Sequence, residues 1–259
     1  MLSLILACLM LNSALAADPE SASTKVEESN EPIRYFQRYK PSYFLMGKPN
    51  TKVNISFKVQ ILREVPLFFG YSQLMIWDLF KTSAPVRDIN FDPELFYRLK
   101  LGGEVGNSRE LDLGILEHES NGRDGPESRS WNRAYLRYTS SRLLPSKGLW
   151  WSMKLALPYG MGEPESKDIP RRRGIWEFQL GITDLFDRIF DVNELVLRVY
   201  GGGGTRLNPL QGGQELTYRE KNSRRVLLLP LYFQIFHGYG ENLLDGKERH
   251  WGFRAGVGF

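Results

Sequence analysis

The chain has 259 residues, of which 42% are hydrophobic, 13% aromatic and 25% charged, and its formal net charge is +4. Its mean hydropathy is -0.35, and beyond the first residues no apolar run approaches the ~18 residues of a spanning helix, which argues against a helical membrane protein. Because the basic residues are mixed with acidic ones and form no stripe, we expect no binding to nucleic acid.

The N-terminal segment MLSLILACLMLNSALA, residues 1–16, resembles the apolar core of a secretory signal peptide. Ala16 ends its Ala-Leu-Ala cleavage motif, although the positively charged start of such signals is missing. The single cysteine, Cys8, lies within this segment, so the mature chain would contain no disulfide. The polar residues 17–40 are expected to form a periplasmic tail, and residues 41–259 the folded domain.

From about residue 42, apolar and polar side chains alternate, which is the period of a β-strand with two different faces. The clearest examples are VNISFKVQI (53–61), LWWSMKLAL (149–157), IWEFQLGIT (175–183) and WGFRAGVGF (251–259). Many segments have the roughly nine to eleven residues that a tilted strand needs to cross a bilayer. About twelve of them follow one another, at roughly 42–48, 52–62, 67–78, 94–101, 110–118, 131–140, 148–158, 174–183, 192–200, 213–220, 225–236 and 250–259.

This order of segments predicts an all-β fold, a twelve-stranded antiparallel transmembrane β-barrel. A closed single-chain barrel in a membrane has an even number of strands, and here long polar links alternate with mostly shorter ones, as expected of outer loops and periplasmic turns. The aromatic last residue, Phe259, resembles the end of bacterial outer-membrane proteins. Five polar side chains are expected to point inward: Lys58, Lys154, Glu177, Gln179 and Arg254.

The link between the fifth and sixth segments, HESNGRDGPESRSWNR (118–133), concentrates hydrogen-bonding side chains. His118 and Ser120 are two residues apart, so both project from the same face of a strand. Asn132 begins the next strand and can return as a cross-strand neighbour, on the face that is expected to contact lipid. A serine nucleophile needs a base, and the base needs a third group to orient it; Ser120, His118 and Asn132 supply these three types of group.

The strand before this site departs from the simple alternation. If the period of two is unbroken, Leu113 falls on the face opposite His118, and Asp112 shares the face of the reactive groups. We expect a β-bulge near Ile115–Leu116 that shifts the alternation by one residue. The alternative is that the assignment of the two faces is wrong.

The stretch resembles the active-site signature of the outer membrane phospholipase A family, H-x-S-N-G followed by S-R-S-W-N-R. The resemblance continues in GYSQLMIW (70–77), TSAPVRDINFDPELF (82–96) and GYGENLLDG (238–246). It implies a calcium-dependent phospholipase, of both A1 and A2 type, that hydrolyses the sn-1 and sn-2 acyl esters of phospholipids and lysophospholipids. By this resemblance Ser120 is the nucleophile, His118 the base and Asn132 the orienting group, facing the outer leaflet of the bacterial outer membrane.

The same resemblance implies a calcium ion near the reacting carbonyl. Ser128 and the backbone carbonyl of Arg123 would provide ligands or hold calcium-bound waters, and Ser83 of the partner subunit would complete the site. These groups are oxygen donors, which a hard cation prefers, and the positive charge would stabilise the developing oxyanion. Where the family often has an acidic residue, this chain has Gly125, with Asp124 one place earlier, so the second calcium position of inactive monomers would be altered.

The resemblance also implies a homodimer as the active form. Gln73 shares with Phe69, Tyr71 and Trp77 a strand face that is expected to contact lipid. A glutamine amide in hydrocarbon needs a polar partner, which the same residue of a second barrel could supply. A bulge that turns Gln73 inward is the alternative.

Two other functions, a passive channel and a structural or adhesive barrel that binds through its loops, are alternatives. The mixed inward charges favour pairing over a wide pore, and all three residue types of the expected triad are present. The basic run at 171–173 either contacts anionic lipid headgroups or forms a solvated loop. His237 and His250 lie at or near strand ends and are expected to be solvated.

Overall fold

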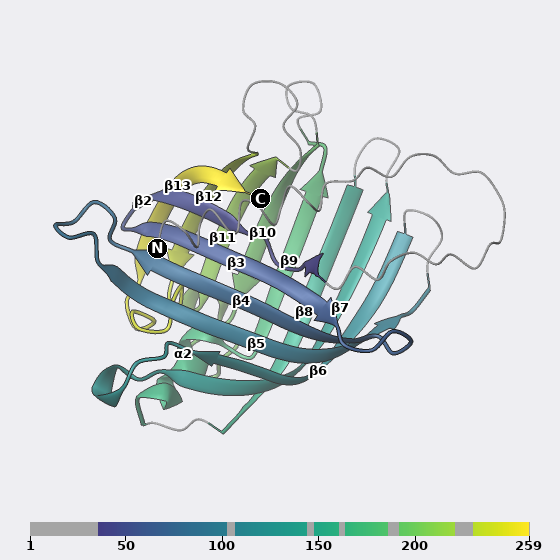
Figure 1. Ribbon diagram of the computed structural model, residues 1–259, viewed down its shortest axis with the longest axis horizontal. Helices are drawn as coiled ribbons and strands as arrows, with labels where there is room; N and C mark the ends of the chain where they lie inside the picture. Colours follow the sequence, from purple (N-terminus) through teal and green to yellow (C-terminus); the bar gives the residue numbers. More distant parts are fainter. Residues whose placement is uncertain are drawn as a thin grey trace.

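The computed structural model describes residues 36–102, 107–143, 148–160, 164–185, 192–220 and 230–258. Strands β2 to β13 pair antiparallel with their neighbours, and the pairing of β3 with β4 closes the sheet into a barrel (Figure 1). The predicted twelve-stranded antiparallel barrel is therefore confirmed. The predicted signal peptide, most of the predicted tail and Phe259 lie outside the described residues.

The strands match the predicted segments closely. The largest difference is at β5, which begins at Val86 instead of Glu94. β12 begins at Leu231, and residues 221–229 before it lie outside the described part of the chain. The barrel strands are β2 (Tyr43–Lys48), β3 (Thr51–Gln60), β4 (Leu67–Trp77), β5 (Val86–Lys100), β6 (Asn107–Ser120), β7 (Ser130–Leu143), β8 (Gly148–Tyr159), β9 (Trp176–Thr183), β10 (Asn193–Tyr200), β11 (Gly213–Glu220), β12 (Leu231–Gly238) and β13 (His250–Gly258).

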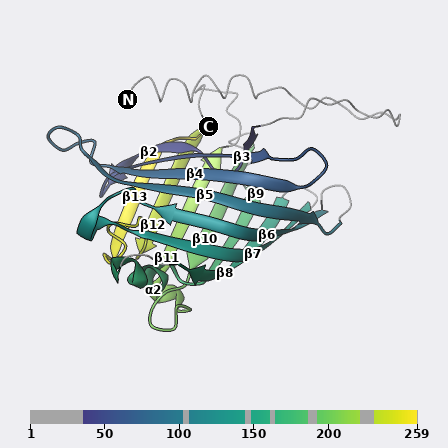
Figure 2. The ribbon, with the colours of Figure 1, turned by 60° about the horizontal axis from the view of Figure 1, so that its bottom comes forward.

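Helical turns occur in the links between strands. They are η1 (Gly125–Glu127), η2 (Pro164–Asp168), α2 (Ile169–Arg173) and η3 (Pro209–Gln211). Among the described residues, no helix is both long enough and apolar enough to span a membrane. Both ribbon views place α2 at the same end of the barrel as the loop that carries η1 (Figure 2).

The barrel is apolar outside and polar inside. Leu136, Leu155 and Leu157 point outward from regular strands and remain between 51% and 70% exposed. Glu94 and Asp112, by contrast, are each 1% exposed and point into the lumen. A soluble barrel has the opposite distribution, and this one is typical of a barrel surrounded by lipid.

Ion pairs fill much of the lumen. Lys154 lies 2.6 Å from Glu117, and Arg198 lies 2.6 Å from Glu177. Both pairs line a cavity of about 420 Å³. The inward orientation that the sequence predicts is confirmed for Lys58, Lys154, Glu177, Gln179 and Arg254. Paired charges that project into the lumen oppose a wide open pore.

The last residues of the predicted tail belong to the sheet. Strand β1 (Gln37–Arg38) pairs with β3 next to the start of β2. Tyr39 then stacks on Phe96 inside the barrel, with ring centroids 5.5 Å apart. Lys40 forms an ion pair of 2.9 Å with Asp92, so the segment before β2 helps to fill the lumen.

The link 239–249 between β12 and β13, which we call the strap, binds to β5. Asp245 accepts two hydrogen bonds from Arg87, at 2.6 and 2.7 Å. The N–H groups of Leu243 and Leu244 donate to Asn90 and Asp88, respectively, at 3.0 and 3.1 Å. β5 and β12 are far apart in the order of the strands, so the strap spans the barrel mouth at this end.

Candidate active site

A β-bulge in β6 sets the orientation of the candidate site. Gly114 pairs with Tyr135, whereas Glu117 pairs with Arg133, so β6 has one more residue than β7 in this interval. The neighbouring side chains of Ile115 and Leu116 both point outward, with 60% and 42% exposure. The predicted bulge is therefore confirmed, and it places the side chains that follow it on the opposite faces from those that an unbroken alternation would give.

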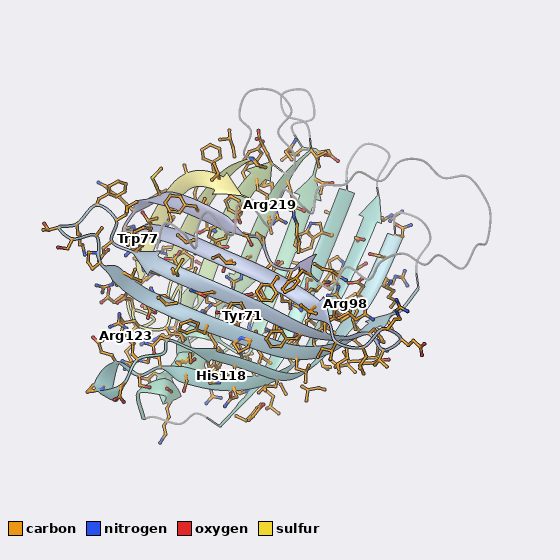
Figure 3. The ribbon with its side chains drawn as sticks, in the orientation of Figure 1. Tyr71, Trp77, Arg98, His118, Arg123 and Arg219 are labelled. Atoms are coloured by element: carbon orange, nitrogen blue, oxygen red, sulfur yellow. The ribbon has the colours of Figure 1, made fainter. Side chains whose placement is uncertain are left out.

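Downstream of the bulge, the polar side chains of the rim divide between the two faces. Glu117 and Glu119 point into the lumen and are buried, whereas His118 and Ser120 are half-buried on the outer face. Asn132 lies directly opposite His118 on β7 and also faces outward. Figure 3 shows His118 on the outer wall of the barrel.

A hydrogen bond joins the base candidate to its orienting group. Nδ1 of His118 donates to Oδ1 of Asn132 over 2.8 Å. The other end of the amide, Nδ2 of Asn132, donates to the backbone carbonyl of Gly160 over 3.0 Å. These contacts leave Nε2 of His118 as the nitrogen that can accept a proton.

On the lumen side of the same strands, a network of hydrogen bonds surrounds Glu119. Glu119 accepts hydrogen bonds from Trp131 at 3.0 Å, from Arg133 at 2.9 Å and from Arg173 at 2.5 Å. The guanidinium of Arg133 also lies 4.1 Å from the centre of the Trp131 ring. Because these side chains alternate with the outward ones along β6 and β7, their network restrains the backbone that carries the candidate triad.

The loop 121–129 is closed by Asn121, which is 5% exposed. Its Oδ1 accepts from the N–H of Arg129 at 2.9 Å, and its Nδ2 donates to the carbonyl of Glu127 at 2.9 Å. Two expected calcium ligands, Arg123 and Ser128, lie within this loop. The side chain of Arg123 contacts Glu127 and folds back onto β5, where it donates to a backbone carbonyl.

The third expected ligand lies elsewhere. Ser83 belongs to the link between β4 and β5 and has a φ of 65°, a left-handed conformation that is uncommon for serine. Trp77 secures this link by donating to the carbonyl of Ala84 over 2.8 Å. The two loops therefore present hydroxyl and carbonyl oxygens, the donor type that calcium prefers.

A separate group of carboxylates lies in the lumen. Atoms of Asp92, Glu94 and Glu117 lie within 4.8 Å of one another, but they include none of the expected calcium ligands. Lys40 lies 2.9 Å from Asp92 and 2.8 Å from Glu94, and Lys154 lies 2.6 Å from Glu117. Cations of the chain itself therefore compensate this acidic group.

Gln73 points outward, as the sequence predicts. It lies in the regular part of β4, opposite Ile55 and Phe91, and the register shift of β4 is confined to the end of the strand near Trp77. Oε1 of Gln73 accepts from the Tyr71 hydroxyl over 2.9 Å. The alternative of an inward-facing Gln73 is thereby excluded.

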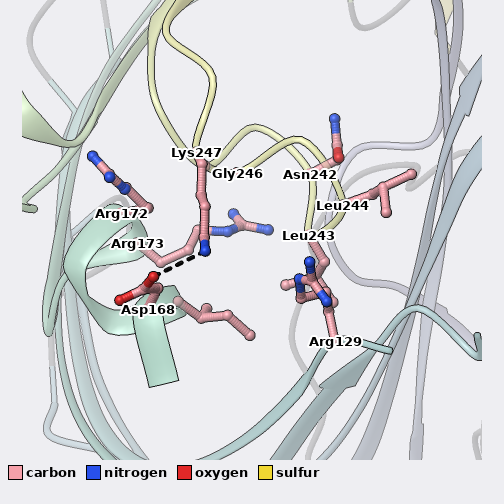
Figure 4. A pocket seen from close by; sticks show the side chains of 11 residues that line it. Arg129, Asp168, Arg172, Arg173, Asn242, Leu243, Leu244, Gly246 and Lys247 are labelled. Carbon is pink, nitrogen blue, oxygen red and sulfur yellow. Dashed lines mark ion pairs between the residues drawn. The ribbon is translucent and has the colours of Figure 1, made fainter. Parts of the chain in front are cut away.

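The arginines of the basic run occupy different environments, and Arg172 and Arg173 line a small open hollow (Figure 4). Arg171 is largely exposed and lies 3.6 Å from Asp168. Arg172 stacks over the ring of Tyr239 at 4.8 Å, and Arg173 turns into the lumen towards Glu119. Across the hollow, Lys247 of the strap hydrogen-bonds Asp168 and thereby lowers the pKa of that carboxyl.

The sequence of this chain is similar to those of known phospholipases. A sequence model of the family described as phospholipase A1 matches residues 20–259. The chain is 33% identical to phospholipase A1 of Proteus vulgaris over 181 residues, which are 68% of this chain and 56% of that protein. It is 30% identical to phospholipase A1 of Escherichia coli K12 over 194 residues, which are 73% of this chain and 60% of that protein. The matched part thus spans less than two thirds of the length of these relatives.

Solved structures show the same fold. Outer membrane phospholipase A from Escherichia coli superimposes with a TM-score of 0.70 at 24% identity, over 90% of this chain and 94% of that one. The Salmonella typhi outer membrane phospholipase, a dimer with bound calcium, gives a TM-score of 0.69 at 23% identity, over 89% and 94% of the two chains. Because the family model extends over the entire barrel, the chain belongs to the phospholipase A1 family.

Proposed function

We propose that this protein is a phospholipase of the bacterial outer membrane that hydrolyses acyl esters of phospholipids with Ser120, His118 and Asn132. The observation that carries the proposal is the 2.8 Å hydrogen bond between His118 and Asn132 on the outer face of the barrel, with Ser120 two residues along the same face. The surrounding wall is apolar and exposed. A lipid molecule of the outer leaflet can therefore reach the hydroxyl without leaving the bilayer.

The reaction uses a serine nucleophile and a histidine base. Nε2 of His118 takes the hydroxyl proton as Oγ of Ser120 attacks the acyl carbonyl, and the tetrahedral adduct collapses by breaking the bond to the glycerol oxygen. His118 returns the proton to that leaving oxygen. Water, deprotonated by His118, then hydrolyses the acyl-serine ester to a free fatty acid and restores Ser120.

A neutral asparagine stabilises the imidazolium less than an aspartate does, so additional positive charge near the acyl carbonyl is valuable. The backbone carbonyl of Arg123, the hydroxyl of Ser128 and Ser83 of the partner subunit would hold a calcium ion. Their oxygens fit a hard cation in kind. When bound, calcium supplies a positive charge for the developing oxyanion. Bound calcium in the Salmonella typhi relative supports a calcium requirement.

A homodimer would complete this site and shield polar groups from lipid. Gln73 presents its amide on the outer face of β4, where only the Tyr71 hydroxyl contacts its oxygen among the described residues. The Nε2 donor of Gln73 can bond to the same residue of a second barrel. The dimeric state of the Salmonella typhi relative supports a homodimer.

The direct test is the Ser120→Ala variant, assayed for fatty-acid release from phospholipid mixed micelles with calcium. We expect the variant to lose hydrolysis while retaining the heat-modifiable migration of a folded barrel. A sulfonyl fluoride should label the wild type and not the variant. Ser141→Ala, near the other end of β7, is the matched control and should remain active. Continued hydrolysis by Ser120→Ala would contradict the proposal.

A further inference from the structure

We propose that the backbone carbonyl of Gly160 positions the Asn132 amide. This carbonyl thereby favours an amide over a carboxylate at position 132. The inference rests on the proposed function. It concerns a residue outside the signature stretch, because Gly160 follows β8, whose last residue, Tyr159, pairs with Asn132. Gly160 is thus a positioning residue that acts through Asn132 and His118.

The amide of Asn132 has two different ends, and the structure uses both. Nδ2 donates to the Gly160 carbonyl over 3.0 Å, and Oδ1 accepts from His118 over 2.8 Å. A backbone carbonyl can only accept, so it must face the NH₂ end of the amide. The oxygen then necessarily faces His118, whose Nδ1 must carry a proton, and Nε2 is left free to act as the base.

A carboxylate at position 132 could not form a hydrogen bond with the carbonyl of Gly160. An aspartate could still accept from Nδ1 of His118, but its second oxygen would face the carbonyl oxygen of Gly160 at hydrogen-bond distance, with no proton between them. The two acceptors repel, which draws the carboxylate away from the histidine. The amide therefore orients His118 better than a carboxylate would, although an aspartate would stabilise the imidazolium better.

Glycine at position 160 allows this approach without strain. Its φ is +55°, in the left-handed region that disfavours side chains. A Cβ built there would lie 3.0 Å from Nδ2 of Asn132, tighter than ordinary contact. Gly102 is a matched comparison, because it also has a positive φ, of +90°, but a Cβ there would meet nothing within 4 Å.

The experiment measures kcat and KM of Asn132→Asp, Gly160→Ala, the double variant and Gly102→Ala, with heat-modifiable migration as the check of folding. We expect each single variant at the site to lower kcat by ~10-fold or more at nearly unchanged KM, because positioned base catalysis contributes ~100- to 10,000-fold. The double variant should be no slower than the slower single variant, because both changes break the same contact. Gly102→Ala should have the wild-type kcat.

A spectroscopic measurement tests the same point without a substitution at Gly160. In wild-type protein with ¹⁵N-labelled histidine, assigned with His118→Gln, we expect neutral His118 to carry its proton on Nδ1. Protonation on Nε2, wild-type activity of Asn132→Asp, or multiplied losses in the double variant would each overturn the role of Gly160. Hydrolysis that persists in Ser120→Ala would instead overturn the proposed function, so the two failures are distinguishable.

Discussion

Leu243 of the strap and Trp131 of β7 share one buried cluster inside the barrel mouth. The side chain next to Trp131, Asn132, lies on the other face of the same strand and holds His118. The strap therefore supports from within the wall that carries the candidate triad outside. The strap is anchored on Arg87, Asp88 and Asn90 of β5. The segments 82–96 and 238–246, which both belong to the family resemblance, therefore have a structural role at this contact.

Truncation of this contact should weaken both the barrel mouth and the site. Leu243 is 4% exposed, so we expect Leu243→Ala to reduce the free energy of unfolding by about 2–5 kcal/mol, through lost burial and the cavity left behind. Thermal unfolding followed by heat-modifiable migration measures this loss. Leu210→Ala, at a position that is 72% exposed, should unfold at the wild-type temperature. Equal unfolding temperatures for the two variants would show that the strap does not brace the wall.

The strap should also make stability depend on acid. Burial alone would raise the pKa of Glu241, but the charges of Lys52 and Arg254 and a hydrogen bond from His250 outweigh it and hold the pKa well below the usual 4.5. Ionised Glu241 therefore contributes stability above about pH 4.5, and the contribution is lost as the pH falls below that value. We expect the unfolding temperature to drop on acidification.

The Glu241→Gln variant tests this assignment. It should remove part of the acid dependence and cost about 3–5 kcal/mol at neutral pH, because it leaves buried cations without their partner. Unfolding temperatures between about pH 3 and pH 7 give both quantities. Glu248→Gln, at an exposed position of the same strap, is the control. An unchanged acid dependence in Glu241→Gln would assign the effect to another carboxylate.

Removal of calcium should stop hydrolysis without unfolding the barrel. We expect EDTA to abolish fatty-acid release and added calcium to restore it, because the neutral Asn132 leaves the oxyanion in need of positive charge. Ser128→Ala should require roughly tenfold more calcium for half-maximal activity, since one oxygen ligand is lost. Calcium titrations of the wild type and the variant measure this shift. Full activity in EDTA would remove the metal from the mechanism.

Loss of the outward amide on β4 should weaken the dimer. We expect Gln73→Ala to reduce chemical cross-linking of two barrels and to lower activity in proportion, because an interbarrel hydrogen bond of ~1 kcal/mol would be lost. Leu197→Ala changes an outward side chain on β10, six strands away in the sheet order, and serves as the control. If both variants cross-link like the wild type, the interface lies elsewhere on the wall.

The fold could be predicted from sequence wherever one strand face is apolar and the other polar. The prediction was least accurate at the start of β5, where Asp88, Asn90 and Asp92 alternate with other residues before Pro93 and give the segment the composition of a loop. These polar side chains point into the lumen, where Asp88 and Asn90 bind the strap and Asp92 binds Lys40. Their partners are distant in sequence, so no local pattern reveals them.

The same limit applies to the site. The pairing of His118 with Asn132 follows from the strand period and from the adjacency of two consecutive strands, and the structure shows it. Gly160 could not be found this way, because it comes from a different hairpin and acts through its backbone. His250 was expected to be solvated, but it lies 2.7 Å from the buried Glu241. A histidine at a strand end does not reveal which loop will fold over it.

The bulge at Ile115–Leu116 has a consequence for how the proposed site can arise. Without the additional residue, His118 and Ser120 would project into the interior, and Glu117 and Glu119 would be forced against hydrocarbon. A single inserted codon in β6 therefore separates a barrel with sequestered reactive groups from one that offers them to the surrounding lipid. The number of residues in one strand therefore decides whether the reactive side chains face the lipid or the lumen.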